Sequence, residues 1–254
     1  MTDTAPSIDF TFSLSGKVAL VTGGGSGIGA AIALAFARKG ATVAVVDLDE
    51  AAATRTAEEL DGRAFACDVA DPASVERTVT DVVAAFGRID ILVNSAGVVA
   101  LAPAEDLTLA DWQRTLDVNL TGTFLMAQAA GRLMLGAGGG TIINLASQAG
   151  SVALDQHVAY CTSKFGVIGL TKVLASEWAG RGVTVNTISP TVVLTDLGRK
   201  AWAGPKGEAL KTLIPTGRFA YPDEIAAAAV FLASAEAAMI NGADLIVDGG
   251  YTIR

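Results

Sequence analysis

The sequence predicts a single α/β domain built on a seven-stranded parallel sheet with helices on both faces, a doubly wound arrangement. Three observations lead to this prediction. Seven short apolar runs end in glycine or polar residues, and stretches with helical apolar periodicity separate them. Near-continuous apolar strands are typical of parallel sheets, because both faces of such sheets are buried. No change of composition divides the 254 residues into two domains.

The predicted elements alternate from one end of the chain to the other. Residues 1–14 have no period and are expected to form an N-terminal arm, and residues 15–254 are expected to form the domain. We expect strands at 17–22, 42–47, 63–68, 89–97 (including the turn that follows), 140–147, 183–190 and 243–250. We expect helices at about 28–39, 49–60, 72–86, 108–136, 157–179 and 222–234, the first of which stops at Lys39-Gly40. Residues 191–217 form a variable region rich in Lys, Gly and Trp.

The composition limits the classes of function. The formal net charge of −8 disfavours nucleic acid, which binds basic faces, and it disfavours an anionic membrane surface. No apolar run approaches the ~20 residues of a membrane span, and the N-terminal MTDTAPSIDF lacks the basic region of a secretory signal. We therefore predict a cytoplasmic protein. A single histidine excludes a multi-histidine metal centre, and Cys67 and Cys161 are expected to be free thiols in core elements.

Three glycines, Gly23, Gly27 and Gly29, separate the first strand from the first helix. A tight turn, a close approach of the backbone and a helix N-terminus are what the pyrophosphate of a dinucleotide requires. A glycine cluster alone is weak evidence, but a strand before it and a helix after it make the signal strong. The alternative is a glycine-rich turn without a ligand. Ser26 and Ile28 of the same turn are also expected to contact the cofactor.

Asp47, at the end of the second strand, indicates the form of the nucleotide. A carboxylate there can accept hydrogen bonds from both ribose hydroxyls of NAD and would repel the 2′-phosphate of NADP. Leu48 follows it, and the glycine turn contains no Arg or Lys, so we predict NAD. The alternative is a loop aspartate that starts a helix. Asp68 and Val69, after the third strand, could hold the adenine edge.

Asn94, Ala96 and Gly97 follow the fourth strand and are expected to flank the cofactor. The reason is topological. Open α/β sheets bind ligands at the carboxyl ends of their strands.

The stretch from Ser147 to Lys164 carries candidate catalytic groups. Tyr160 and Lys164 stand at i and i+4, so a helix places them on one face. A nearby ammonium favours the phenolate, and we therefore predict that Lys164 lowers the pKa of Tyr160 enough for it to act as a general base. Ser147 on a preceding loop could hold the substrate oxygen. Taken alone, such a Tyr–Lys pair is more often an ordinary surface or half-buried pair.

Together, these motifs resemble the short-chain dehydrogenase/reductase family. The resemblance covers the chain from about Ser15 and rests on TGGGSGIG (22–29), Asp68-Val69, NSAG (94–97), Asn119 in DVNLTGTF, Ser147 and YCTSK (160–164). It implies a Rossmann-type fold, with Tyr160 as the general acid/base. It also implies that Lys164 binds the nicotinamide ribose, that Ser147 stabilises the substrate oxygen and that Asn119 holds a water linked to Lys164. The resemblance further implies a homotetramer, and no metal is needed.

One motif departs from the pattern of this family. Where the family has Pro-Gly after the sixth strand, this chain has Pro190-Thr191, so the backbone at Thr191 should avoid positive φ. Thr195 keeps its place to hold the nicotinamide carboxamide, and Pro190 and Val193 are expected beside the cofactor. The stretches SPTVVLT and VDGGYTIR resemble the polyol dehydrogenases of the family, including those that act on D-threitol and related alditols.

The substrate pocket is expected between residues 148–157 and 191–217. Its polar candidates, which could instead face solvent, are Gln148, Ser151, Asp155, Gln156 and His157. Several polar groups suit a polyol better than an acyl chain. Trp202 could close over the substrate as part of a lid, or it could be ordinary packing.

The sequence therefore predicts NAD-dependent oxidation of a secondary hydroxyl of a polyol to the ketose. Two enzymatic alternatives are a reductase of 3-oxoacyl thioesters, which Asp47 disfavours, and a dehydrogenase of another secondary alcohol. An alternative of another class is a non-catalytic NAD-binding protein. The complete set of Asn119, Ser147, Tyr160 and Lys164 speaks against this last reading.

Overall fold

A computed structural model describes residues 8–253 and contains a seven-stranded sheet in which all strands run parallel. The strand order is β3-β2-β1-β4-β5-β6-β7. The strands are β1 (Val18–Thr22), β2 (Thr42–Asp47), β3 (Arg63–Ala66), β4 (Ile91–Asn94), β5 (Gly140–Leu145), β6 (Val183–Pro190) and β7 (Asp244–Val247). This arrangement confirms the predicted fold class.

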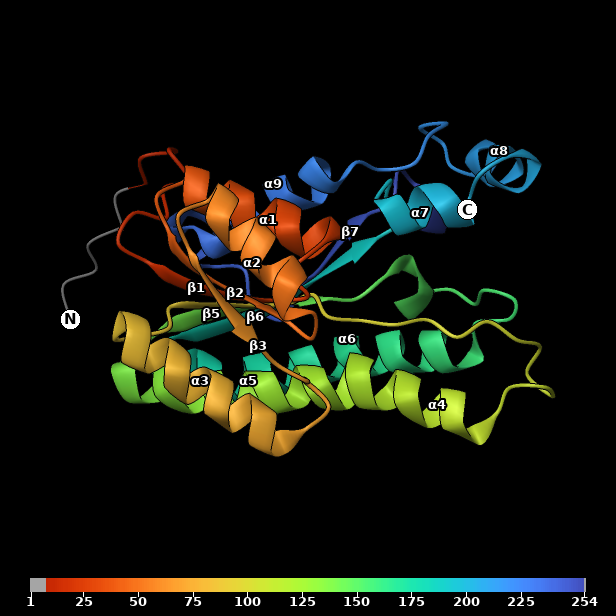
Figure 1. The fold of residues 1–254 in the computed structure, drawn as a ribbon. Helices are drawn as coiled ribbons and strands as arrows, with labels where there is room; N and C mark the ends of the chain where they lie inside the picture. Colours follow the sequence, from red (N-terminus) through yellow and green to blue (C-terminus); the bar gives the residue numbers. More distant parts are fainter. Residues whose placement is uncertain (1–7, 254) are drawn as a thin grey trace.

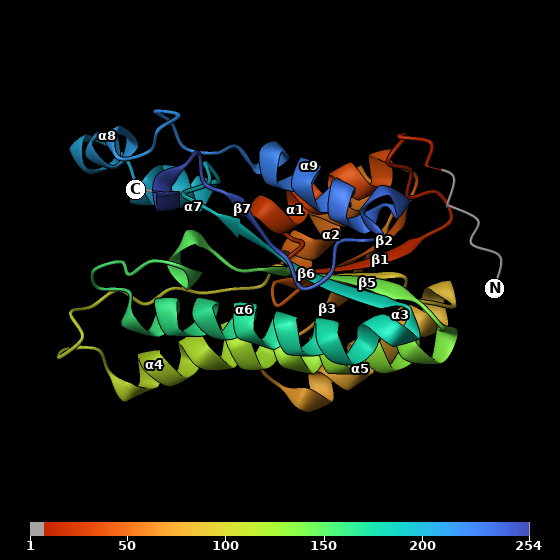
Figure 2. The same ribbon diagram turned by 180° about the vertical axis from the view of Figure 1, so that it is seen from behind.

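Helices cover both faces of the sheet (Figure 1; Figure 2, from behind). One layer consists of α1 (Gly27–Arg38), α2 (Glu50–Glu59) and α9 (Pro222–Ala233), and α1 packs against α9. The other layer consists of α3 (Pro72–Phe86), α4 (Leu109–Leu116), α5 (Gly122–Ala137) and α6 (Val158–Trp178). In this layer α3 packs against α5, and α6 packs against both α4 and α5.

Two hydrophobic cores, one on each face, explain why the strands are apolar throughout. Along β1, Ala19 and Val21 point into the core that α1 and α9 cover, whereas Leu20 points into the core of the opposite face. A polar residue at either set of positions would be buried without solvent. The continuous apolar runs that predicted the parallel sheet therefore follow from its two covered faces.

Two predicted regions differ from the structure. Residues 108–136 do not form one continuous α-helix, because a π-helical turn, Asp117–Thr121, separates α4 from α5. The variable region contains two short helices, α7 (Asp196–Ala201) and α8 (Pro205–Thr212). Both lie at the carboxyl end of the sheet (Figure 1).

The described part of the N-terminal arm packs on the domain. Leu14 is buried, and the ring of Phe12 meets that of Phe231 edge-on, with 6.1 Å between their centroids. The predicted arm also includes residues 1–7, which lie outside the described residues. Both cysteines are free as predicted, although only Cys67 is buried and Cys161 is partly exposed.

The strand order changes direction between β1 and β4, and this determines where a ligand site can form. β1 pairs with β2 on one side and with β4 on the other, so the chain turns in opposite directions on leaving the two strands. The chain leaves β1 for α1 on one face of the sheet and leaves β4 for α4 on the other, and open α/β sheets bind ligands at such a point. Within residues 8–253, no helix is both long enough and apolar enough to cross a membrane.

Candidate active site

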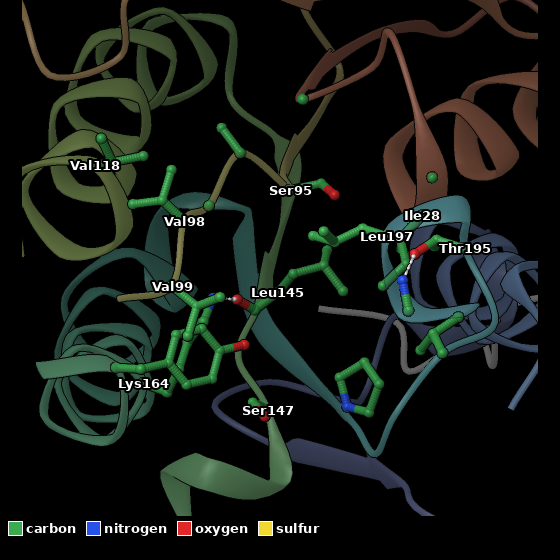
Figure 3. A pocket seen from close by; sticks show the side chains of 18 of the residues that line it. Ile28, Ser95, Val98, Val99, Val118, Leu145, Ser147, Lys164, Thr195 and Leu197 are labelled. Atoms are coloured by element: carbon green, nitrogen blue, oxygen red, sulfur yellow. Dashed lines mark hydrogen bonds between the residues drawn. The ribbon is translucent and has the colours of Figure 1, made fainter. Parts of the chain in front are cut away.

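A cleft of about 1750 Å³ follows the carboxyl edge of the sheet and brings most of the predicted site residues together. Segments that follow β1 to β6 all contribute to its wall. The predicted residues that line it are Gly23, Ser26, Gly27, Ile28, Gly29, Asp47, Asp68, Val69, Ala96, Gly97, Ser147, Gln148, His157, Tyr160, Lys164, Pro190, Val193, Thr195 and Trp202. Figure 3 shows Ser147 and Lys164 on one side of this cleft and Ile28 and Thr195 on the other.

The glycine turn has no room for a side chain at Gly23 or Gly29, because neighbouring backbone lies close to both. Gly23 has φ of +63°, and a Cβ atom there would lie 2.9 Å from the backbone of Ala96. A Cβ atom at Gly29 would overlap the carbonyl oxygen of Gly23. Ser26, the N-cap of α1, is exposed and makes no side-chain cap bond. The free amides at the start of α1 and this hydroxyl fit the pyrophosphate of a dinucleotide.

Asp47 is held in place by backbone donors. Its Oδ2 accepts from the amide of Gly25 at 3.0 Å, and its Oδ1 accepts from the amide of Asp49 at 3.0 Å. The carboxylate therefore stands fixed between the glycine turn and the start of α2, within the cleft wall. This fits the ribose of a bound dinucleotide. Further along the cleft, Asp68 is exposed and its Oδ1 accepts from the amide of Ala70.

The first turns of α6 present Tyr160 and Lys164 to the cleft. The ammonium of Lys164 lies 5.6 Å from the centroid of the Tyr160 ring, and it donates to the carbonyl oxygen of Leu145 at 2.6 Å (Figure 3). Ser147 follows β5 and caps a 3₁₀ turn, where its Oγ accepts from the amide of Ala149 at 3.1 Å. The predicted Ser–Tyr–Lys grouping is thus assembled in one place.

Burial controls the protonation of this pair. It raises the pKa of the Tyr160 phenol, an effect that the nearby Ser147 hydroxyl only partly offsets. Burial also lowers the pKa of Lys164 from 10.5 to about 8. In the chain by itself the pKa of Tyr160 therefore lies above its ordinary value, and the lowering by Lys164 stays a prediction. Loss of hydration is the largest cause of this rise.

Asn119 lies in the π-helical turn and does not line the cleft. Its Oδ1 accepts from the amide of Val98 at 2.8 Å, and its Nδ2 donates to the carbonyl of Val98 at 2.9 Å and to Oγ of Ser163 at 3.1 Å. The Ser163 hydroxyl in turn donates to the carbonyl of Tyr160. The side chain therefore ties the loop after β4 to the first turns of α6, and the predicted water at Asn119 stays a prediction.

Asn94 and Ser151 are not brought to the cleft. Asn94 is buried, and its Nδ2 donates to Oδ1 of Asn144 at 2.9 Å. Asn144 donates to Thr171 on α6, so these residues tie β4 and β5 to that helix. Ser151 is exposed outside the cleft wall.

The remaining substrate candidates lie where a substrate could reach them. Leu154–His157 and Thr191–Leu197 both line the cleft, as the predicted pocket requires. The ring of His157 meets that of Tyr160 at a centroid distance of 6.1 Å, and its Nδ1 lies 2.6 Å from the carbonyl oxygen of Asp155. Trp202 both lines the cleft and packs on Phe219, with ring centroids 6.2 Å apart.

Sequence reasoning missed one face of α4. Ala110, Gln113, Arg114 and Asp117 line the cleft and stand at the spacing of a single helix face. The spacing was visible in the sequence, but only the tertiary fold shows that this face meets the cleft. Thr191 also lines the cleft, and as expected it is not among the described residues with positive φ. Ser163 was missed because only its contact with Asn119 gives it a role.

Known proteins are similar to this chain in both sequence and fold. Residues 23–252 match the protein family described as enoyl-(acyl carrier protein) reductase. D-threitol dehydrogenase of Mycolicibacterium smegmatis is 70% identical, over 98% of this chain and 97% of its own. NAD-dependent glycerol dehydrogenase of Listeria innocua is 50% identical, over 97% of this chain and 98% of its own. The crystal structure of a gluconate 5-dehydrogenase from Burkholderia cenocepacia, in complex with NADP and tartrate, superposes with a TM-score of 0.92 at 36% identity, covering 96% of this chain and 98% of that one.

Proposed function

Because the chain belongs to the short-chain dehydrogenase/reductase family, we propose that it oxidises a secondary hydroxyl of a polyol such as D-threitol to the ketose, reversibly and with NAD. The observation that carries the proposal is the 70% identity to a D-threitol dehydrogenase over 98% of this chain. The grouping of Ser147, Tyr160 and Lys164 in the same cleft as the glycine turn supports it. Such a reaction belongs to polyol metabolism.

The chain's own groups divide the work of alcohol oxidation. The substrate hydroxyl docks between Ser147 and Tyr160. The Tyr160 phenolate accepts the hydroxyl proton, while the Ser147 hydroxyl donates a hydrogen bond to the substrate oxygen as it becomes a carbonyl. The Lys164 ammonium would stabilise the phenolate and would hold the nicotinamide ribose. When bound, the oxidised nicotinamide would supply a hydride acceptor, and its positive charge would favour the phenolate against the cost of burial.

The preference for NAD over NADP rests on Asp47. Its fixed carboxylate lies in the cleft wall, where it would accept from ribose hydroxyls and repel a 2′-phosphate. The Listeria relative is named as NAD-dependent, whereas the Burkholderia structure contains NADP, so both cofactors occur among related proteins. The carboxylate at this position favours NAD for this chain.

We also propose that the enzyme is a homotetramer, in which α4, α5 and α6 pair across one interface and α9 and β7 pair across another. Large apolar side chains are exposed on these helices, at Phe124 and Leu133 of α5 and at Phe165 and Val173 of α6. Exposed apolar side chains along packed helices are typical of subunit interfaces. Light scattering from the purified protein measures the mass directly, and a monomer would contradict this part of the proposal.

The experiment that tests the function is an initial-rate assay by NADH absorbance. Threitol, erythritol, arabitol, xylitol and galactitol are compared, with NAD and NADP side by side. We expect turnover with NAD on one or two alditols of four or five carbons. Tyr160→Phe removes the proton acceptor and keeps the ring, so it should lower kcat by at least about a hundredfold. NADPH-linked reduction of an acyl thioester without polyol turnover would contradict the proposal, and NADH binding without any turnover would indicate a non-catalytic protein.

A further inference from the structure

Two polar groups in the cleft wall are buried without a hydrogen-bond partner. Gln148 is 4% exposed and Thr191 is 8% exposed, and both line the cleft. Within residues 8–253, neither Oε1 of Gln148 nor Oγ1 of Thr191 has a partner. Buried polar atoms almost always have a hydrogen-bond partner, because an unpaired one loses its hydrogen bonds to water without replacement. Two such atoms in one cleft wall therefore call for a ligand that would pair them.

Both residues lie beside the catalytic serine. Gln148 follows Ser147, while Thr191 follows the last residue of β6. β5 and β6 are neighbours with Leu145 opposite Ile188, and the amide of Ala146 donates to the carbonyl of Ile188 at 2.9 Å. The segments that follow β5 and β6 thus leave the sheet side by side. The 3₁₀ turn that contains Gln148 packs against β6.

The chemistry of the two groups fits an alcohol. A hydroxyl both donates and accepts, and here the amide oxygen of Gln148 can accept while the hydroxyl of Thr191 can donate. A glycine at position 191, as in the Pro-Gly pattern of the family, would offer no such donor. No charged side chain is required, which suits a neutral polyol.

We propose that Gln148 and Thr191 form a subsite for a second substrate hydroxyl, next to the one that Ser147 and Tyr160 hold. This inference rests on the proposed function and extends it, because it makes the enzyme selective for vicinal diols. The second hydroxyl donates to Oε1 of Gln148 and accepts from Oγ1 of Thr191. A substrate with a single hydroxyl leaves both atoms unpaired and is discriminated against.

The test replaces Thr191 by Val, which keeps the branched shape and removes the hydroxyl. We expect the KM for D-threitol to rise about three- to tenfold, the equivalent of one hydrogen bond, with the KM for NAD within about twofold of wild type. Thr191→Ser, which restores a hydroxyl, should recover most of the loss. The melting temperature of Thr191→Val should not fall, because the lost hydroxyl has no partner in the free protein.

Two further comparisons make the test selective. The ratio of kcat/KM for butane-2,3-diol to that for butan-2-ol should fall in Thr191→Val and in Gln148→Leu. Thr184→Val makes the same change on β6 outside the cleft wall and serves as the matched control, for which the ratio should stay at the wild-type value. An unchanged KM for D-threitol in Thr191→Val, or an equal rise in the KM for NAD, would overturn the subsite. Absence of polyol turnover by the wild type would instead overturn the proposed function, and the subsite with it.

Discussion

Lys164 is a cation that the fold buries at a cost in stability. Its pKa is lowered from 10.5 to about 8, so between these values the unfolded chain binds more protons than the folded chain. Stability of the wild type therefore rises as the pH increases from about 8 to 10.5, and below pH 8 the full penalty applies. The shift corresponds to about 3 kcal/mol. Removal of the Lys164 side-chain nitrogen would leave the carbonyl oxygen of Leu145 without this donor, at a cost of about 1 kcal/mol.

We therefore expect Lys164→Met to be more stable than the wild type but inactive. The gain in the free energy of unfolding should be about 2 kcal/mol at pH 7 and should shrink towards zero above pH 10, because the wild type then loses its buried charge. Urea unfolding at pH 7, 8.5 and 10 measures this dependence. A stability difference that does not change with pH would refute the assignment of the cost to the ammonium.

Asp47 should control the choice between NAD and NADP. Asp47→Ala removes both the acceptor for the ribose hydroxyls and the repulsion of a 2′-phosphate, so the ratio of kcat/KM for NAD to that for NADP should fall at least about tenfold. Asp49→Ala is a matched control, since Asp49 caps α2 through the amide of Ala52 and does not line the cleft. It should cost about 1 kcal/mol of stability and leave the ratio unchanged. Equal ratios in both variants would contradict the role of Asp47.

At the residue scale, spacing along the sequence predicted the position of side chains that depend only on their own helix or turn. Tyr160 and Lys164 share a helix face by their spacing, and the glycine turn is defined by its flanking elements. Asn94 and Asn119 could not be placed in this way, because their partners, Asn144 and Val98, lie far along the chain or across a loop. The direction of the Tyr160 pKa shift likewise depends on burial, which spacing does not reveal.

At the element scale, the junction of β1 and α1 should tolerate no side chain. Gly29→Ala places a Cβ atom on the carbonyl oxygen of Gly23, so the turn must open and NADH binding should weaken at least about tenfold. Gly136→Ala is the matched control, because that exposed helical position has open space around it. It should add about 0.5–1 kcal/mol of stability. NADH fluorescence titration and thermal unfolding measure both effects, and wild-type affinity in Gly29→Ala would contradict the close packing of the turn.

Apolar runs and helix caps account for the elements that were predicted well. α3 begins where the Asp71 carboxylate accepts from the amides of Ala73 and Ser74, and it ends at Gly87 with φ of +82°. α7 and α8 were missed because they are short and their starts depend on single features, the Thr195 cap and Pro205. The break between α4 and α5 was missed because the π-helical turn Asp117–Thr121 contains neither glycine nor proline, the residues that signal a helix break in a sequence.

At the scale of the whole molecule, the cleft joins segments that follow six of the seven strands. A ligand that fills it must stabilise the folded chain against complete unfolding. At a hundred times its Kd, NADH should add about 2.7 kcal/mol, which raises the Tm by roughly 5–10 °C for a chain of this size. NADPH at the same concentration should give a smaller rise. Thermal scans with each nucleotide check this, and equal shifts would speak against a preference for NAD.

The π-helical turn at Asp117–Thr121 sets how far α4 is rotated relative to α5 about their common axis. Each residue turns an α-helix by 100°, so the extra residue that such a turn accommodates sets the rotation of everything before it relative to everything after it. Deleting one residue there would mend the hydrogen-bond ladder and swing Gln113 and Arg114 about a quarter-turn away from the cleft. The π-helical turn thus offsets the two helices, so that α5 presents an apolar side to the sheet and α4 presents polar side chains to the cleft.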